Sequence, residues 1–280
     1  QNGELTFAKS LKNLGYDTML AGKWHLGHGS SNVSPLANGF EGFVGCRGGC
    51  IDYFTHAYAT EPDWWRGDRA VVEEGEATDL IADAAAEFIE SHGVKGDDDD
   101  PFLLVVSFTA PHYGKSRLDQ VVSDPGTLVT RKAGGLRQDT NGIPRQPVNT
   151  LQSTVADLEA VGGPIVTEGG PDAGAVVAHA ATIDRNVRRR HYAAMMKALD
   201  DGVERVLSAL EESGRENVVV IFTADNGPDE TVSNAGSSGR WRGGKHGLQE
   251  GGTRVPSILR WPGVVPAGST IDQLGGLIDL

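Results

Sequence analysis

The sequence predicts an α/β fold with a mostly parallel central sheet that is flanked by helices on both faces. Segments with helical spacing of apolar residues alternate along the chain with short apolar runs, the order expected of helices and parallel strands. The runs "YDTMLA", "PFLLVVSFTAPH" and "NVVVIFTADNG" have the length of strands. The last two are rich in Val, Leu and Phe, which is typical of strands buried on both faces.

The first 66 residues predict one helix, one strand and a long irregular segment. Helical spacing predicts a helix over 4–14, followed by Gly15 as a favourable C′ residue; its apolar positions are Leu5, Ala8, Leu11 and Leu14. A short strand over 16–21 ends at the turn "GKWH". Residues 28–66 are rich in Gly, Pro, Ser and aromatic residues, which indicates irregular structure.

A second helix is predicted before the longest acidic run. Thr78 is a suitable N-cap for a helix over 79–92, and Gly93 follows its end. The run "GDDDD" at 96–100 then indicates a hydrated acidic turn. Its four carboxylates lack the glycine-punctuated spacing of a calcium loop.

The remainder of the chain predicts three further elements and one excursion. A buried strand is predicted over 101–112 and a long amphipathic helix over 184–213. Strands are also predicted within 217–227 and 254–263. Residues 114–180 lack periodicity and contain many Gly, Pro and Thr residues, so we interpret them as an atypical insertion.

Composition excludes several classes of protein. The formal net charge of −13 and the pI of about 5.0 argue against general nucleic-acid binding. A locally positive pocket in an acidic protein still binds anionic substrates. No run of about 20 apolar residues is present, so no transmembrane helix is expected. Cys46 and Cys50 indicate ordinary thiols or one local disulfide, because no further zinc ligands follow at regular spacing.

Three predicted strands end in polar residues. Lys23 and His25 follow the first strand, His112 the second, and Asp225 and Asn226 the third. Ligands of open α/β sheets gather at the carboxyl ends of the strands. We therefore expect these residues to meet at one edge of the sheet.

Two of the motifs have a structural as well as a chemical interpretation. Asp225 and Asn226 suit a hard cation such as Ca²⁺ or, less well, Mg²⁺, although Asp-Asn-Gly is also a strong turn sequence. Calcium takes about six to eight oxygen ligands, so further carboxylates are needed. Lys245 and His246 lie between two glycine pairs and suit either oxyanion binding or a flexible basic loop. A cation site with lysines and histidines suits sulfate or phosphate esters.

The order of the motifs resembles that of the type I sulfatases, of the arylsulfatase and N-acetylgalactosamine-sulfatase kind, in the alkaline-phosphatase-like superfamily. The motifs are "GYDTMLAGKWHLG", "GFEGFVGCRGGCIDYFTH", "APH", "FTADNGP" and "GGKHGLQEGGTRVPSILRWPG". The resemblance covers roughly residues 1–112 and 184–280. It implies an alkaline-phosphatase-like α/β fold and hydrolysis of sulfate esters.

The resemblance also implies roles for single residues. Lys23 and Lys245 would hold the sulfate oxygens, and His25 would steady the hydroxyl of the nucleophile. His112 would contact the sulfate and the leaving-group oxygen. Calcium would be bound by Asp225 and Asn226. His246 has no implied role.

The sequence departs from the family at its nucleophile. Sulfatases make a formylglycine from Cys or Ser in a Cys/Ser-x-Pro/Ala-x-Arg motif, and this motif is absent here. We expect residues 1–280 to be a partial catalytic domain, incomplete at both ends. The nucleophile segment and an acidic pair would lie upstream, and a smaller C-terminal subdomain downstream. The chain alone is then expected to be inactive.

Several questions of function stay open at the level of sequence. The expected substrate is a sulfated saccharide or a small aryl sulfate, and the family is usually exported to the periplasm, the lysosome or the exterior. Trp64, Trp65 and Trp241 suit either sugar stacking or a core. One alternative is a phosphodiesterase or phosphonate hydrolase of the same superfamily. The other is a non-catalytic homologue that binds sulfated glycans.

Overall fold

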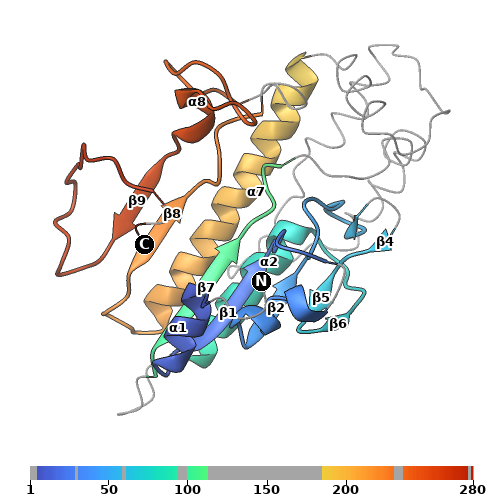
Figure 1. Ribbon diagram of the computed structural model, residues 1–280, viewed down its shortest axis with the longest axis vertical. Coiled ribbons are helices and arrows are strands. Elements are labelled where there is room, and N and C mark those ends of the chain that lie inside the picture. The colour runs from blue at the N-terminus through green and yellow to red at the C-terminus, as the bar shows by residue number, and fades with distance from the viewer. Residues whose placement is uncertain are drawn as a thin grey trace.

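The computed structural model contains a five-stranded mixed sheet (Figure 1). It describes residues 5–28, 31–58, 61–93, 100–112, 185–229, 236–276 and 279. The strand order is β6-β5-β2-β1-β7. The parallel strands are β1 (Asp17–Gly22), β2 (Gly42–Gly45) and β7 (Phe102–Ser107). The antiparallel strands are β5 (Trp65–Arg66) and β6 (Arg69–Ala70). The prediction of a mostly parallel sheet is thus only partly confirmed, because a hairpin extends one edge.

Two short antiparallel pairs complete the strands of the described residues. β3 (Ala57–Tyr58) pairs with β4 (Glu61–Pro62), and β8 (Val220–Thr223) pairs with β9 (Ser257–Arg260). Both β8 and β9 lie where the sequence predicts strands. The prediction that they belong to the parallel sheet is wrong for the described residues, because the two strands pair with each other.

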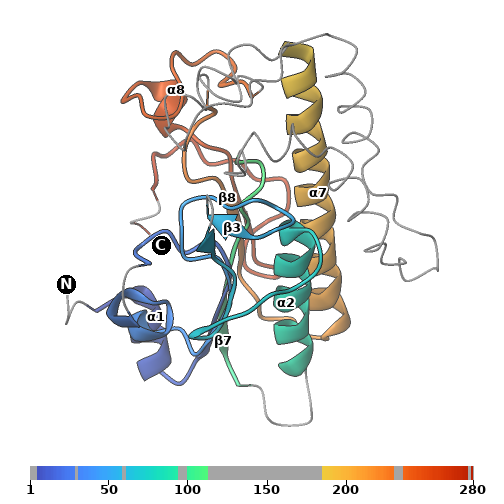
Figure 2. The same cartoon turned by 90° about the vertical axis from the view of Figure 1, so that its right-hand side faces the viewer.

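Helices lie on both faces of the sheet, as predicted. α1 (Phe7–Asn13) lies on one face, and α2 (Ala77–Ser91) and α7 (Arg185–Glu212) lie side by side on the other (Figure 2). The smaller helices are α8 (Glu250–Thr253) and the 3-10 turns Ser31–Val33 and Leu36–Asn38. In the part of the chain that the structure describes, no helix is long and apolar enough to span a membrane.

The helix ends correct two predictions. α1 begins at Phe7 rather than at residue 4, because Thr6 accepts a hydrogen bond from Lys9 N and caps the first turn. α2 begins at Ala77 and is capped by Glu76, not by Thr78. The Glu76 carboxylate accepts hydrogen bonds from Thr78 N at 2.9 Å and from Asp79 N at 3.2 Å. Gly15 follows α1 with a φ of 89°, as the predicted C′ residue requires.

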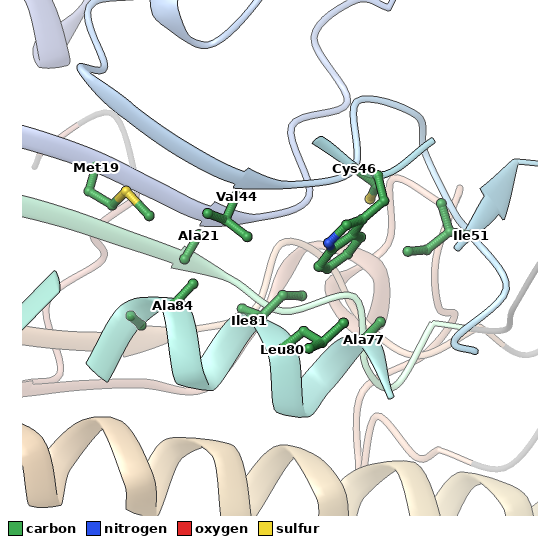
Figure 3. Close-up of a cluster of buried hydrophobic side chains, with 11 residues drawn as sticks. Met19, Ala21, Val44, Cys46, Ile51, Ala77, Leu80, Ile81 and Ala84 are labelled. Carbon is green, nitrogen blue, oxygen red and sulfur yellow. The ribbon is translucent and has the colours of Figure 1, made fainter. Parts of the chain in front are cut away.

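The core contains one layer on each face of the sheet and a third cluster between α2 and α7, which consists of Ala86, Ile89, Ala209 and Leu210. Residues that alternate along β1 and β2 point to opposite faces. One layer packs against α2 (Figure 3) and contains Met19, Ala21, Val44, Trp64, Leu80, Ile81, Ala84 and Ala85 among its buried residues. The other packs against α1 and contains Ala8, Leu20, Phe40 and Phe43. Burial on both faces makes β1 an interior strand and leaves the carboxyl edge for polar residues.

The segment predicted to be irregular over 28–66 contains the strand β2. Only Phe43 and Val44 of β2 are apolar, and the strand begins and ends at glycine. Its pairing with β1 aligns Leu20 with Phe43, so a long-range partner decides the conformation. The proposed insertion over 114–180 and most of the acidic run lie outside the described residues.

Candidate active site

The site is built on the carboxyl end of β1, where the chain leaves the sheet between β2 and β7. Gly22 has a φ of 119°, and a Cβ there would lie 2.1 Å from the carbonyl oxygen of Ser107 on β7. Only glycine permits this approach. The next residue, Lys23, donates its N–H to the same Ser107 oxygen at 2.8 Å. The half-buried side chain of Lys23 is thereby fixed at the sheet edge.

His25 adopts a left-handed backbone conformation at the same edge. Its φ is 55°, which is uncommon for a residue with a side chain. The N–H of His25 donates to Arg47 O at 3.2 Å, and Trp24 N donates to Cys46 O at 2.9 Å. The imidazole lies against the backbone of Gly49, where a Cβ would come within 2.4 Å of Nε2. The turn that follows β1 therefore aims His25 at the loop that follows β2.

Asp225 and Asn226 follow β8 and lie beside the loop that carries Lys245. Gly227 N donates to Gly252 O at 3.0 Å, and Lys245 N donates to Pro228 O at 2.8 Å. These two hydrogen bonds hold the segments after β8 and around α8 together. The prediction that Asp225 and Lys245 belong to one site thus has a structural basis in the backbone.

The glycine pairs around Lys245 are explained by close backbone contacts. A Cβ on Gly227 would lie 1.8 Å from Gly251 O, and a Cβ on Gly251 would lie 2.0 Å from Gly243 O. No other residue fits these positions without displacement of the backbone. The loop is therefore a packed structure and not the flexible basic loop that was the alternative interpretation. His246 has a φ of 70° and an exposed side chain.

Four of the predicted residues lie within electrostatic reach of one another. Burial and the ammonium group of Lys245 lower the pKa of Lys23, while the carboxylate of Asp225 opposes this. Partial burial and the two ammonium groups of Lys23 and Lys245 lower the pKa of His25. The two ammonium groups outnumber the single nearby carboxylate of Asp225, and a local excess of positive charge suits the binding of an anion. The neutral form of His25 is favoured near pH 7.

His112 lies five residues beyond the end of β7 and directly follows Pro111, whose peptide bond with Ala110 is cis. Its N–H donates to Thr109 O at 2.9 Å, and its carbonyl accepts a hydrogen bond from the Tyr53 hydroxyl at 2.7 Å. The backbone of His112 is thus fixed at the same edge of the sheet.

Asp225 and Asn226 supply only part of a calcium site. The Asn226 amide nitrogen donates to Gly227 O at 2.8 Å, which leaves its Oδ1 for a cation. The Asp225 side chain is exposed and has no hydrogen-bond or ion-pair partner among the described residues. No group of three or more His, Cys, Asp or Glu side chains in the described ranges is arranged to hold a metal. The two residues fit calcium as oxygen donors, but they fill a minority of its ligand positions.

Cys46 and Cys50 are buried free thiols. Burial raises the pKa of Cys46 to about 12. A thiol that stays protonated at neutral pH is a poor nucleophile, because the thiolate is the reactive form. The structure thus supports the interpretation of two ordinary thiols over that of a local disulfide.

Trp64 and Trp65 belong to the core rather than to a sugar-binding surface. Trp64 is 1% exposed and donates to Glu73 at 3.0 Å. The Trp65 ring is covered by the Arg47 guanidinium at 3.8 Å.

Sequence reasoning missed the loop 47–49 and Asp63, which accepts hydrogen bonds from that loop. The adjacent glycines "GG" between the two cysteines were the available signal, since they indicate close packing.

Comparison with known proteins identifies the family. The sulfatase family model matches residues 1–280. The chain is 25% identical to mouse (Mus musculus) arylsulfatase J, and the match covers 98% of this chain and 37% of the relative. It is 27% identical to mouse N-acetylgalactosamine-6-sulfatase, covering 100% of this chain and 44% of the relative. The chain thus spans about two-fifths of the length of these curated relatives.

A solved structure shows the same fold. The crystal structure of Ps i-CgsB in complex with k-i-k-neocarrahexaose aligns with a TM-score of 0.62 at 22% identity, covering 95% of this chain and 51% of that chain. The similarity includes the mixed α/β architecture with helices on both sides of the sheet.

Proposed function

The chain belongs to the sulfatase family, and we propose that it supplies the sulfate-binding part of a site that hydrolyses sulfate esters. One observation carries the proposal. Lys23 and His25 follow β1, Asp225 follows β8 and Lys245 precedes α8, and these three segments lie within electrostatic reach of one another. The match to the family over the whole chain supports sulfate over phosphate esters.

Within the proposed site, Lys23 and Lys245 bind the oxygens of the sulfate group and stabilise the charge that develops on them. His25, neutral because of its surroundings, accepts and returns a proton at the sheet edge. His112 stands near the leaving-group oxygen. Asp225 and Asn226 would hold calcium, which would add positive charge at the sulfate, while a formylglycine from outside these 280 residues would supply the nucleophile.

The proposed substrate is a sulfated saccharide, with a small aryl sulfate as the simpler alternative. The name of the mouse N-acetylgalactosamine-6-sulfatase specifies a sulfated amino sugar for that protein. In this chain, Arg240 and Arg254 lie over the Trp241 ring at 4.5 and 4.4 Å. Arg254 is also paired with Glu250, so Arg240 is the cation of this group that favours a substrate with more than one negative charge. Export of the whole protein is part of the same proposal.

The test is turnover by the protein encoded at the complete locus. We expect calcium-dependent, multiple-turnover hydrolysis of 4-methylumbelliferyl sulfate, and loss of that activity in Lys23→Ala and Lys245→Ala variants. The 280-residue chain serves as the control and is expected to show no turnover. A preference for phosphate diesters would favour a phosphodiesterase. Binding of sulfated glycans without any turnover would indicate a non-catalytic homologue.

A further inference from the structure

The loop Arg47–Gly49 lies beside His25 and is held from behind by one buried carboxylate. Asp63 is 7% exposed. One of its oxygens accepts a hydrogen bond from Arg47 N at 3.1 Å, and the other accepts one from Gly48 N at 2.7 Å. Two successive N–H groups that converge on a carboxylate form an anion nest. The conformation of the loop thus depends on the charge of Asp63.

Asp63 is itself held in place. Its first oxygen also accepts the indole N–H of Trp65 at 2.7 Å, and its backbone N–H donates to His56 O at 3.0 Å. The Arg47 guanidinium is engaged elsewhere, on the Trp65 ring at 3.8 Å and with Asp68 at 2.7 Å. The carboxylate of Asp63 therefore accepts its hydrogen bonds from the backbone of the loop and from the Trp65 indole.

The loop in turn determines where the His25 ring lies. A Cβ at position 49 would lie 2.4 Å from His25 Nε2 and 2.7 Å from Cε1. The ring rests directly on the backbone of Gly49, and His25 N donates to Arg47 O. Any shift of residues 47–49 moves the surface on which the imidazole packs.

We propose that Asp63 is a positioning residue for His25 and acts through the backbone of Arg47–Gly49. The proposal rests on the proposed function, because it assigns the loop a role in presenting His25 to a bound sulfate. Asp63 lies on the far side of the loop and does not touch the substrate. Its contribution is geometric: it fixes the left-handed turn and the ring against one wall of the site.

Two variants test the proposal by different routes. Asp63→Asn keeps the size of the side chain but turns one acceptor into a donor that faces an N–H of the loop. Gly49→Ala leaves Asp63 intact and places a methyl group where the His25 ring lies. Glu61→Gln removes the same charge from an exposed side chain two residues before Asp63, and serves as the matched control.

The measurement is the imidazole ¹H–¹⁵N spectrum of the 280-residue chain, in which His25→Gln assigns the His25 signals. We expect Asp63→Asn and Gly49→Ala to displace the His25 signals. Those of His92, which lies beyond the end of α2 and contacts Asp17 at 3.0 Å, should stay in place. Glu61→Gln should leave both unchanged. In a sulfate titration, we expect both loop variants to weaken binding about tenfold, as the loss of one hydrogen bond to an anion would.

The outcomes separate this proposal from the proposed function. Unmoved His25 signals in a folded Asp63→Asn chain overturn the positioning role. If that variant does not fold, unmoved signals in Gly49→Ala overturn it instead. Displaced His25 signals in the variants support the positioning role whether or not sulfate binds. If sulfate does not perturb the His25 signals of the unmodified chain, that result contradicts the proposed function and not the positioning role.

Discussion

Replacement of Lys245 by methionine tests the pairing of two lysines at the sheet edge. The ammonium group of Lys245 lowers the pKa of both Lys23 and His25. We therefore expect two effects of Lys245→Met in the 280-residue chain. The affinity for inorganic sulfate falls, because one cation is lost, and the pKa of Lys23 rises, because a repelling charge is gone.

The size of both effects follows from the surroundings of Lys23. A hydrogen bond between charged groups contributes about 1.5–3 kcal/mol, which corresponds to a rise of roughly 10- to 150-fold in the Kd for sulfate. Two like charges about 4 Å apart repel by about 1 kcal/mol in bulk water and by more in a half-buried site. Removal of this repulsion is therefore expected to raise the pKa of Lys23 toward its ordinary value.

Calorimetry with sodium sulfate at constant ionic strength measures the affinity, and ¹³C-methyl NMR of reductively methylated lysines measures the pKa of Lys23. Lys12→Met is the matched control, because Lys12 lies in the last turn of α1 and its ammonium group contacts Glu41 at 3.1 Å. If Lys245→Met changed neither the affinity nor the pKa of Lys23, the two lysines would not share a site. The proposed function would then lose its main support.

Three further predictions concern stability and substrate charge. Burial raises the pKa of Glu76 from 4.5 to about 7. The folded chain therefore holds the proton more tightly than the unfolded chain, and the contribution of Glu76 to stability is fully present below pH 4.5. This contribution is lost as the pH rises through 7. Glu76→Gln should remove on the order of 3 kcal/mol of pH dependence between pH 4.5 and 8, and urea unfolding with an unchanged pH profile would contradict this. Ile81 is fully buried in the α2 layer, so Ile81→Ala should lower the free energy of unfolding by about 2–5 kcal/mol, whereas Val72→Ala at a 92% exposed site should not. Arg240 lies over the Trp241 ring, so Arg240→Ala should weaken binding of a multiply sulfated oligosaccharide more than binding of sulfate, as measured by calorimetry, and equal losses would count against a polyanionic substrate.

The sheet edge could be predicted from the sequence because its signals are local. Apolar runs of strand length predict β1 and β7, and the polar residues just beyond them mark the carboxyl ends. Lys23 and His25 therefore fall where the general behaviour of α/β sheets places ligands. The grouping of Asp225 with Lys245 depends on backbone contacts between distant glycines, such as Gly227 and Gly251. The glycine pairs in the sequence indicate close backbone packing, but they do not show that Gly251 packs against Gly227.

The support behind His25 could not be predicted, because it depends on a partner that looks ordinary in the sequence. Asp63 stands before two tryptophans in a stretch that reads as a loop. Only the fold shows that its carboxylate is buried against Arg47 N and Gly48 N.

The N-cap of α2 was predicted wrongly for a similar reason. Glu is not a favoured N-cap residue, and burial of Glu76 beside Thr78 decides the choice.

The strand β8 presents the most instructive difference between sequence and structure. Its composition is that of a strand buried on both faces, yet Ile221 and Phe222 are each 40% exposed, and Ile258 on the paired strand β9 is 62% exposed. Exposed apolar side chains on a sheet are typical of a surface that another element covers. The apolar composition of β8 therefore predicts a covered surface, and the exposure of Ile221, Phe222 and Ile258 does not match that prediction. An element packed on the β8–β9 pair would reconcile the two, because it would bury these side chains.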